Sequence, residues 1–155
     1  MATEIEHKFL VVDDGWRAGV ERAVAMRQGY LVSDAVRSVR VRVEGDSAAL
    51  NVKGAVVGIA RREYEYAIPL ADAAEMLDEL CGQKVEKTRH YVRHAGHLWE
   101  VDVFEGANAG LVVAEIELAH AGEPFVRPPW VGADVSHDLR YYNSQLAVHP
   151  YQDWR

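Results

Sequence analysis

The feature that most constrains the fold of this chain is an alternation of apolar and charged residues with a period of two, which recurs along most of the sequence. Near the N-terminus, Ile5 and Phe9 fall on one face of an extended segment, whereas Glu4, Glu6 and Lys8 fall on the other. Successive side chains of a β-strand point to opposite sides, so this period indicates strands with one apolar and one polar face. We therefore expect a mainly β protein.

The same alternation predicts about eight strands in all. The Gly45-Asp46 pair is a turn signal and predicts a hairpin between two of them. The spacing of the strands is typical of antiparallel sheets or barrels. The segments that follow the first strand are those around residues 30–32, 39–44, 50–53, 63–68, 87–91, 99–104 and 114–118.

Two stretches break the period of two. Residues 16–26 and 70–80 carry apolar side chains at helical spacing among charged ones, which predicts two amphipathic helices. Pro69 suits the start of the second helix, and Gly82 lies where it would end. Residues 127–130 contain two prolines and predict a loop, and a short helix is expected after Asn143. The predicted fold class is α+β, mainly β, with a few flanking helices.

Length and charge limit the classes of function. The 155 residues correspond to one domain spanning 1–155. The net charge of −7 argues against binding to duplex nucleic acid or anionic lipid. No run of about 18 apolar residues is present, and the N-terminus carries acids rather than the bases of a signal peptide, so a cytoplasmic location is expected. The single cysteine, Cys81, excludes an internal disulfide and argues against a cysteine-based metal site.

The charged residues of the strands are sorted into pairs of like sign on the same face. One interpretation is a sheet whose charged face is simply solvated. The other is a barrel whose charged face is the interior, although such an interior cannot be dry. The pairs are Glu4/Glu6, Glu63/Glu65 and Glu115/Glu117, which are acidic, and Arg40/Arg42 and Lys87/Arg89, which are basic.

A charged interior would need ligands of both signs, because burying unpaired ions costs several kcal/mol each. Arginine and lysine suit phosphate oxygens. Carboxylates suit a hard cation such as Mg²⁺ or Mn²⁺. The second interpretation therefore predicts a site for a polyanion together with a divalent metal.

These residues resemble the CYTH superfamily, the triphosphate tunnel metalloenzymes that include class IV adenylyl cyclases, thiamine triphosphatases and inorganic tripolyphosphatases. Glu4-Ile5-Glu6-His7-Lys8 matches the ExExK signature of that family. The resemblance covers nearly the whole chain and is greatest for short, single-domain bacterial members. Its other motifs appear in the family's order at residues 27–31, 40–42, 53–54, 62–65, 85–89, 100–104, 115–117 and 138–143.

The resemblance implies a closed eight-stranded antiparallel barrel that forms a tunnel for a triphosphate-containing small molecule. The implied phosphate-binding residues are Lys8, Arg40, Arg42, Lys53, Lys87, Arg89 and Arg140. The implied ligands of Mg²⁺ or Mn²⁺ are Glu4, Glu6, Glu115 and Glu117, with Glu63, Glu65 and Asp102 available for a second metal or for orienting water. The candidate catalytic residues are Glu4, Glu6, Tyr30, Lys87 and Asp102.

Two positions differ from what is common in the family. Leu139 stands before Arg140 where short bacterial relatives often carry a base, and His7 stands where relatives commonly carry arginine. His7 falls on the face opposite the glutamates, so we expect it outside the barrel.

The resemblance favours hydrolysis of the terminal phosphate of inorganic tripolyphosphate. An adenylyl cyclase, a thiamine or nucleoside triphosphatase in the same cage, and a non-catalytic polyphosphate-binding module are the alternatives that the sequence leaves open. It also leaves open the oligomeric state, with a homodimer as one option.

Overall fold

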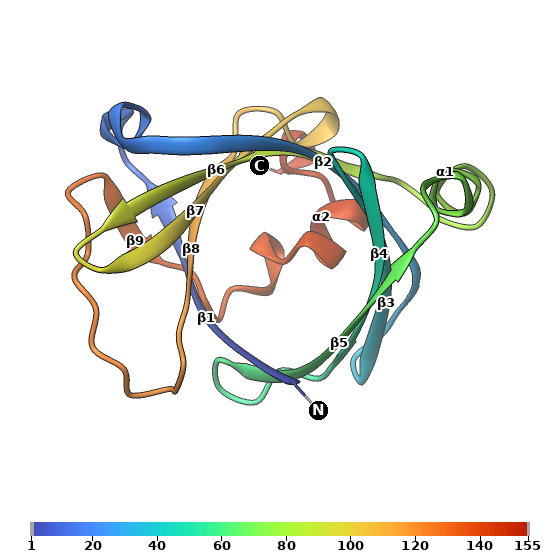
Figure 1. The fold of residues 1–155 in the computed structure, drawn as a ribbon, viewed down its shortest axis with the longest axis horizontal. Coiled ribbons are helices and arrows are strands. Elements are labelled where there is room, and N and C mark those ends of the chain that lie inside the picture. The colour runs from blue at the N-terminus through green and yellow to red at the C-terminus, as the bar shows by residue number, and fades with distance from the viewer. Residues whose placement is uncertain (1, 155) are drawn as a thin grey trace.

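A computed structural model describes residues 2–154, and eight of the nine strands in this range form a closed antiparallel barrel (Figure 1). The strands pair in the order β5-β4-β3-β2-β6-β7-β8-β1, and β1 also pairs with β5, which closes the ring. The predicted eight-stranded barrel is therefore confirmed, and β9 adds an extra strand beside β1. The strands are β1 Ala2–Val11, β2 Val20–Ser33, β3 Arg37–Glu44, β4 Ser47–Gly54, β5 Ala60–Ile68, β6 Val85–His94, β7 His97–Phe104, β8 Val112–Glu117 and β9 Val131–Asp134.

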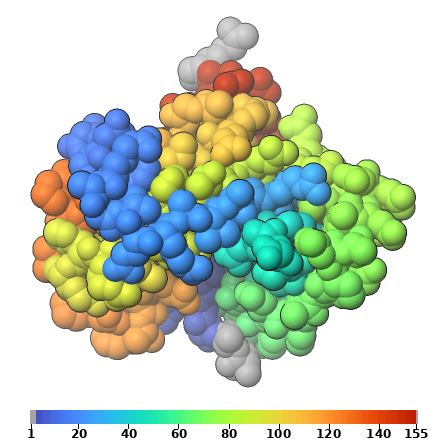
Figure 2. Space-filling model, turned by 45° about the horizontal axis from the view of Figure 1, so that its top comes forward, coloured from blue at the N-terminus to red at the C-terminus, as the bar shows by residue number. Residues whose placement is uncertain are grey.

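The helix predicted over residues 16–26 is wrong. The chain forms only the short 3₁₀ helix η1 (Gly15–Gly19) and then enters β2, the longest strand within residues 2–154, at Val20. Figure 2 shows β2 running across one face of the molecule, from the blue segment near η1 toward the turquoise turn between β3 and β4. Pairing with β6 on one side and β3 on the other satisfies its backbone groups, and this tertiary pairing outweighs a weak helical pattern.

Helix α1 (Leu70–Glu79) covers part of the outer surface of the barrel, as Figure 1 shows. Its Ala73 and Leu77 are fully buried against Val41 of β3. The helix and the residues after it approach the barrel so closely that a Cβ at Gly29 of β2 would lie 3.1 Å from Leu77 Cδ2 and 2.8 Å from the Cβ of Cys81. The helix predicted over residues 70–80 is thus confirmed, and Cys81 belongs to its apolar packing.

A second apolar cluster covers the outer faces of β1, β7 and β8. Phe9 and Trp99 lie at its centre, and Trp16 of η1 and Trp130 of the loop before β9 close over them. Residues 127–130 form no helix, as predicted. The barrel is therefore apolar on the outside where these segments cover it.

The C-terminal segment closes one end of the barrel. It contains η3 (Leu139–Tyr141), α2 (Asn143–Val148), which is the short helix expected after Asn143, and η4 (Tyr151–Asp153). Leu146 of α2 packs with Val85 and Phe104, and Figure 1 shows α2 within the outline of the ring. The remaining short helix, η2 (Gly106–Asn108), lies between β7 and β8. No helix within residues 2–154 has the length and apolarity needed to cross a bilayer.

Candidate functional site

The inside of the barrel holds a cavity of about 240 Å³ whose lining is mostly charged. Eight carboxylates and six cationic side chains face it. The carboxylates belong to Glu4, Glu6, Glu44, Glu63, Glu65, Glu100, Glu115 and Glu117, and the cations to Lys8, Arg40, Arg42, Lys53, Arg61 and Arg89. The charged face of the strands is therefore the interior of the barrel and not a solvated surface.

Strand register explains why the charges gather. Glu6 lies opposite Glu117, and Lys8 lies opposite Glu115, across the β1–β8 pair. Directly opposed residues of an antiparallel pair point to the same side of the sheet, so each inward charge brings its cross-strand partner with it. The period of two along each strand then keeps every second residue in the cavity.

Glu4 lies in a cluster with two cations. Lys53 Nζ lies 3.0 Å from Glu4 Oε2 and 3.1 Å from Glu63 Oε2, and Arg61 Nε donates to Glu4 Oε1 at 3.1 Å. Burial raises the pKa of Glu4, but Lys53 and Arg61 outweigh it and bring that pKa to about 2. Glu4 is therefore an ionised carboxylate whose charge is already neutralised.

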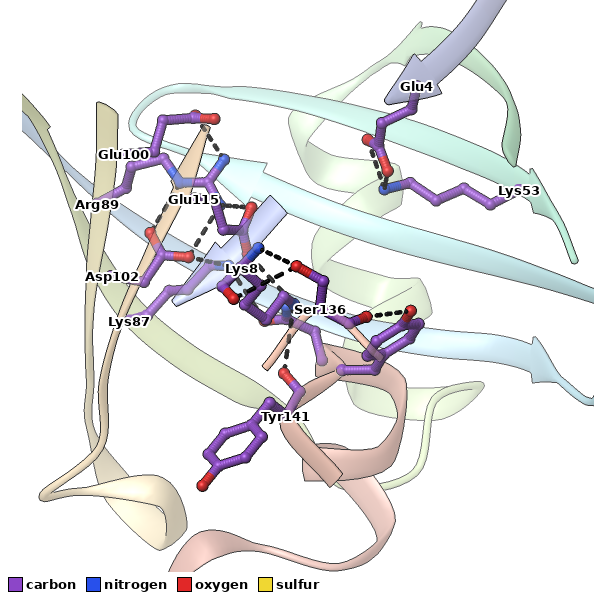
Figure 3. A network of polar contacts seen from close by, with 12 residues as sticks. Glu4, Lys8, Lys53, Lys87, Arg89, Glu100, Asp102, Glu115, Ser136 and Tyr141 are labelled. Atoms are coloured by element: carbon purple, nitrogen blue, oxygen red, sulfur yellow. Dashed lines mark hydrogen bonds and ion pairs between the residues drawn. The ribbon is translucent and has the colours of Figure 1, made fainter. Parts of the chain in front are cut away.

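Arg89 and Lys87 form a second cluster, around Asp102 (Figure 3). Arg89 donates two hydrogen bonds of 2.8 Å to the Asp102 carboxylate and one of 2.8 Å to Glu100, and Lys87 Nζ donates to Asp102 at 2.8 Å. Burial raises the pKa of Asp102, but Arg89 and Lys87 lower it below its ordinary value. Burial lowers the pKa of Lys87 to about 7, with Asp102 opposing and Arg89 adding to the shift.

Glu6 and Glu117 differ from these carboxylates, because no cation lies within ion-pair distance of either among residues 2–154. Burial and the charges of Glu115 and Glu4 raise the pKa of Glu6 to about 8. Burial and neighbouring carboxylates, Glu4 first among them, also raise the pKa of Glu117. Glu6 and Glu117, which lie opposite each other on β1 and β8, are thus two neighbouring cavity carboxylates with raised pKa values and no ion-pair partner among the described residues.

The C-terminal segment contributes to the floor of the cavity. The Tyr141 carbonyl accepts a hydrogen bond from Lys8 Nζ at 3.3 Å, and Asn143 Oδ1 accepts one from Lys87 Nζ at 3.1 Å. The ring of Tyr142 lies 5.1 Å from Lys8 Nζ and 5.9 Å from the Arg61 guanidinium carbon. Two expected phosphate-binding lysines are thus fixed by the segment that closes the barrel.

Most of the residues expected at the site face this cavity. They are Glu4, Glu6, Lys8, Tyr30, Arg40, Arg42, Lys53, Glu63, Glu65, Arg89, Glu115 and Glu117. Lys87 and Asp102 lie behind its wall, where both are fully buried.

Arg140 is not brought to the cavity. Its side chain is 59% exposed and pairs with Asp138 at 2.7 Å, and the neighbouring Leu139 is also exposed. His7 lies outside the barrel, as expected, where it contacts the rings of Phe9 and Phe125.

Sequence reasoning missed several lining residues. Arg61 could have been found, because the period of two places it on the same face of β5 as Glu63 and Glu65. Glu100 could have been found in the same way, from its alternation with Trp99 and Val101. Tyr142 had no such signal, because only the fold brings the C-terminal segment back to the cavity.

The chain matches known proteins over its whole length. Residues 2–151 match the CYTH domain. A protein of Acetivibrio thermocellus named inorganic triphosphatase is 46% identical, over 100% of this chain and 99% of its own length. One of the same name from Nitrosomonas europaea is 37% identical, over 94% of this chain and 97% of its own. The crystal structure of the inorganic triphosphatase NE1496 superimposes with a TM-score of 0.67 at 36% identity, covering 96% of both chains. This chain belongs to the CYTH domain family.

Proposed function

We propose that this protein hydrolyses the terminal phosphate of inorganic tripolyphosphate with the help of a divalent cation. The observation that carries the proposal is the joint presence of six cationic and eight acidic side chains in one barrel cavity. The names of the two relatives support the choice of substrate. The cavity volume of about 240 Å³ also supports a small substrate, because sites for drug-sized ligands have volumes of about 300–1,000 Å³.

The charge balance of the cavity supports the need for a cation. The lining carboxylates outnumber the lining cations by two, and the Lys87–Asp102 pair behind the wall adds one of each sign. With all of these groups ionised, a polyanion entering such a cavity alone would meet net repulsion. Mg²⁺ or Mn²⁺ accompanying the triphosphate would lower that repulsion.

The donor chemistry of the cavity fits such a cation. Among residues 2–154, no three acidic, histidine or cysteine side chains converge closely enough to form a ready metal site. Glu6 and Glu117 are nevertheless carboxylates without a cationic partner, and hard divalent cations prefer oxygen ligands. We therefore assign the cation to Glu6 and Glu117, with Glu115 and Glu4 beside them.

The internal ion pairs suggest how the ligands enter. Lys8 lies 3.3 Å from Glu115, and Lys53 lies 3.0 Å from Glu4. Phosphate oxygens could replace these carboxylates as partners of the lysines, and the released carboxylates would then be available to hold the cation. Lys8, Lys53, Glu115 and Glu4 would then each have a partner of opposite charge in both arrangements.

The reaction is attack of water on the terminal phosphorus, in line with the bridging oxygen, whose bond to that phosphorus breaks. The products are orthophosphate and diphosphate. Catalysis of this kind depends on positioning and on neutralising charge on the phosphoryl oxygens. A bound divalent cation supplies part of that neutralisation. Lys8, Lys53, Arg40, Arg42 and Arg89 supply the rest.

Two further groups, Asp102 and Tyr30, act in this scheme. Asp102 holds Arg89 and Lys87 in place through its hydrogen bonds. Tyr30 lines the cavity opposite Arg40 on the neighbouring strand and is assigned to positioning the reacting groups.

The test is phosphate release from tripolyphosphate, ATP and thiamine triphosphate, measured in parallel with Mg²⁺, Mn²⁺ or chelator. We expect metal-dependent release that is fastest from tripolyphosphate. Faster release from ATP or thiamine triphosphate would overturn the substrate assignment, and turnover that persists in chelator would overturn the cation. Binding of tripolyphosphate without any turnover would make the protein a polyphosphate-binding module.

A further inference from the structure

Two arginines of the cavity are held differently from its other cations. Arg42 Nε donates to Gln28 Oε1 at 3.0 Å, and Arg40 Nε donates to Asn51 Oδ1 at 3.4 Å. Within residues 2–154, no carboxylate lies within ion-pair distance of either guanidinium, whereas Arg89 is paired with Asp102, Glu100 and Glu115. Arg40 and Arg42 thus keep a positive charge that nothing beside them neutralises.

The strand register makes both amides direct neighbours of the arginines. Gln28 lies opposite Arg42 across the β2–β3 pair, and Asn51 lies opposite Arg40 across the β3–β4 pair. Both amide side chains are almost fully buried, with exposures of 0% for Gln28 and 1% for Asn51. Asn51 is itself fixed, because its Nδ2 donates to Glu65 Oε2 at 3.0 Å. Each amide is thus buried beside an arginine that lines the cavity.

The chemistry of an amide explains why it suits this place. A guanidinium has only donors, so its Nε needs an oxygen, and an amide offers one that carries no full charge. The Gln28 Nε2 group is buried and has no hydrogen-bond partner in the described part of the chain. Leaving a buried N–H unpaired costs free energy. The bond from Arg42 to Oε1 is thus the only hydrogen bond in the described residues that orients the Gln28 side chain. A carboxylate at the same position would hold Arg42 equally well but would cancel its charge.

We propose that Gln28 and Asn51 are positioning residues of the triphosphate site, which fix Arg42 and Arg40 through the Nε groups and leave both positive charges available to the phosphate chain. This inference rests on the proposed function. The remaining guanidinium nitrogens can then bind phosphate oxygens through charge-assisted hydrogen bonds. In agreement, burial and the charges of Arg40 and Arg89 lower the pKa of Arg42 to about 10, as expected for a cation without a neutralising partner.

The decisive variant is Gln28→Glu, which keeps the size of the side chain and its hydrogen bond but adds a negative charge. We expect KM for tripolyphosphate to rise about tenfold or more, because Arg42 would form an ion pair with the new carboxylate and lose its charge-assisted contact with phosphate. The value of kcat should change much less. The matched control is Gln83→Glu, which makes the same change at an exposed loop position and should leave KM unchanged. Asn51→Asp is the variant for Arg40 and should also raise KM, but unlike Gln28→Glu it removes a hydrogen bond, the one from Asn51 Nδ2 to Glu65.

A second set of variants separates positioning from a merely structural role. Gln28→Leu removes the acceptor without adding charge and should raise KM about threefold in the native background, but it should have no effect on KM in an Arg42→Ala background. A structural role would instead lower the melting temperature and leave KM unchanged in both backgrounds. That result, or an unchanged KM in Gln28→Glu, would overturn the inference. The proposed function would still stand if the wild-type protein hydrolyses tripolyphosphate. Lack of turnover by the wild-type chain would overturn both.

Discussion

The two faces of the barrel strands carry opposite kinds of interaction, and β1 shows the contrast within a few residues. On the outer face, Phe9 packs against Trp99 in an apolar cluster. On the inner face, Glu4, Glu6 and Lys8 line the charged cavity. Burial of apolar surface stabilises a fold by about 25 cal/mol per Å², whereas buried ion pairs contribute little net stability because desolvation offsets their attraction. Along one strand, the outward residues therefore provide apolar burial and the inward residues alternating with them line the charged cavity.

The difference between the two faces explains why other segments of the chain pack on the outside of the barrel. The inner face provides an apolar cluster only at one end, where Leu146 of α2 packs on Val85 and Phe104, so most of the apolar core forms on the outside. Helix α1 supplies it over β3 and β4, and η1 with the loop before β9 supplies it over β1, β7 and β8. The comparison predicts that inner-face substitutions change turnover and outer-face substitutions change stability.

The largest effect is expected from Glu117→Gln on the inner face. Removing a proposed ligand of the cation should lower metal-dependent turnover by about 10³-fold. The melting temperature without cation should stay the same or rise, because burial and the charges of Glu4, Glu100 and Glu63 already disfavour ionised Glu117. Turnover and thermal unfolding measured side by side check both expectations.

Glu75→Gln, at an exposed position of α1, is the control for this prediction. It makes the same chemical change on the outside of the barrel and should alter neither quantity. A Glu117→Gln protein with native turnover would contradict the assignment of Glu117 to the cation.

The next largest effect is expected from Leu77→Ala on the outer side. Leu77 is fully buried between α1 and the barrel, and truncating such a residue costs about 2–5 kcal/mol through lost contacts and the cavity left behind. The urea midpoint of unfolding should fall accordingly, while KM and kcat of the folded protein stay native. Leu80→Ala, at a position with 65% exposure, should shift the midpoint far less. A Leu77→Ala protein that stays as stable but loses turnover would break the division between the faces.

A smaller effect, and one confined to KM, is expected from Arg40→Ala. Its guanidinium is buried in the cavity wall and has no acidic partner among the described residues, so its removal should weaken phosphate binding by about 10- to 100-fold. Steady-state kinetics with tripolyphosphate measures the change. Arg37→Ala is the control, because Arg37 lies on the same strand with its side chain 64% exposed. An unchanged KM in Arg40→Ala would remove this residue from the phosphate-binding set.

The contrast between the faces also explains how much of the fold the sequence predicts. Strands with one apolar and one charged face, such as β1, β3 and β7, have a clear period of two and are predicted correctly. The first half of β2 fails, because the run of Val20, Ala23, Val24 and Ala25 mimics a helix face when its neighbours are unknown. Its strand conformation depends on pairing with β6, a partner about 65 residues away in sequence.

The same dependence on strand periodicity determines which residues of the site can be predicted from the sequence. The inward carboxylates and bases are predictable because they follow the period of two of their strands. Arg61 could have been predicted on the same basis. The contacts of Tyr142 and Asn143 with Lys8 and Lys87 were not, because they depend on a chain that returns from the C-terminus to the floor of the cavity. Pairing of acids with particular bases is equally a property of the closed barrel, since it joins strands that are distant in sequence.

The smallest effect is expected from Arg140→Ala, which tests the boundary of the site. Family resemblance suggests a phosphate ligand at this position, but its guanidinium pairs with Asp138 and lies over the Trp154 ring at 4.9 Å on the surface. Exposed ion pairs and cation–π contacts contribute little, so KM for tripolyphosphate should stay within about twofold of the native value. A rise comparable to that in Arg40→Ala would show that the C-terminal segment rearranges to bring Arg140 to the substrate. In that case the floor of the cavity, unlike its walls, would be completed only when triphosphate binds.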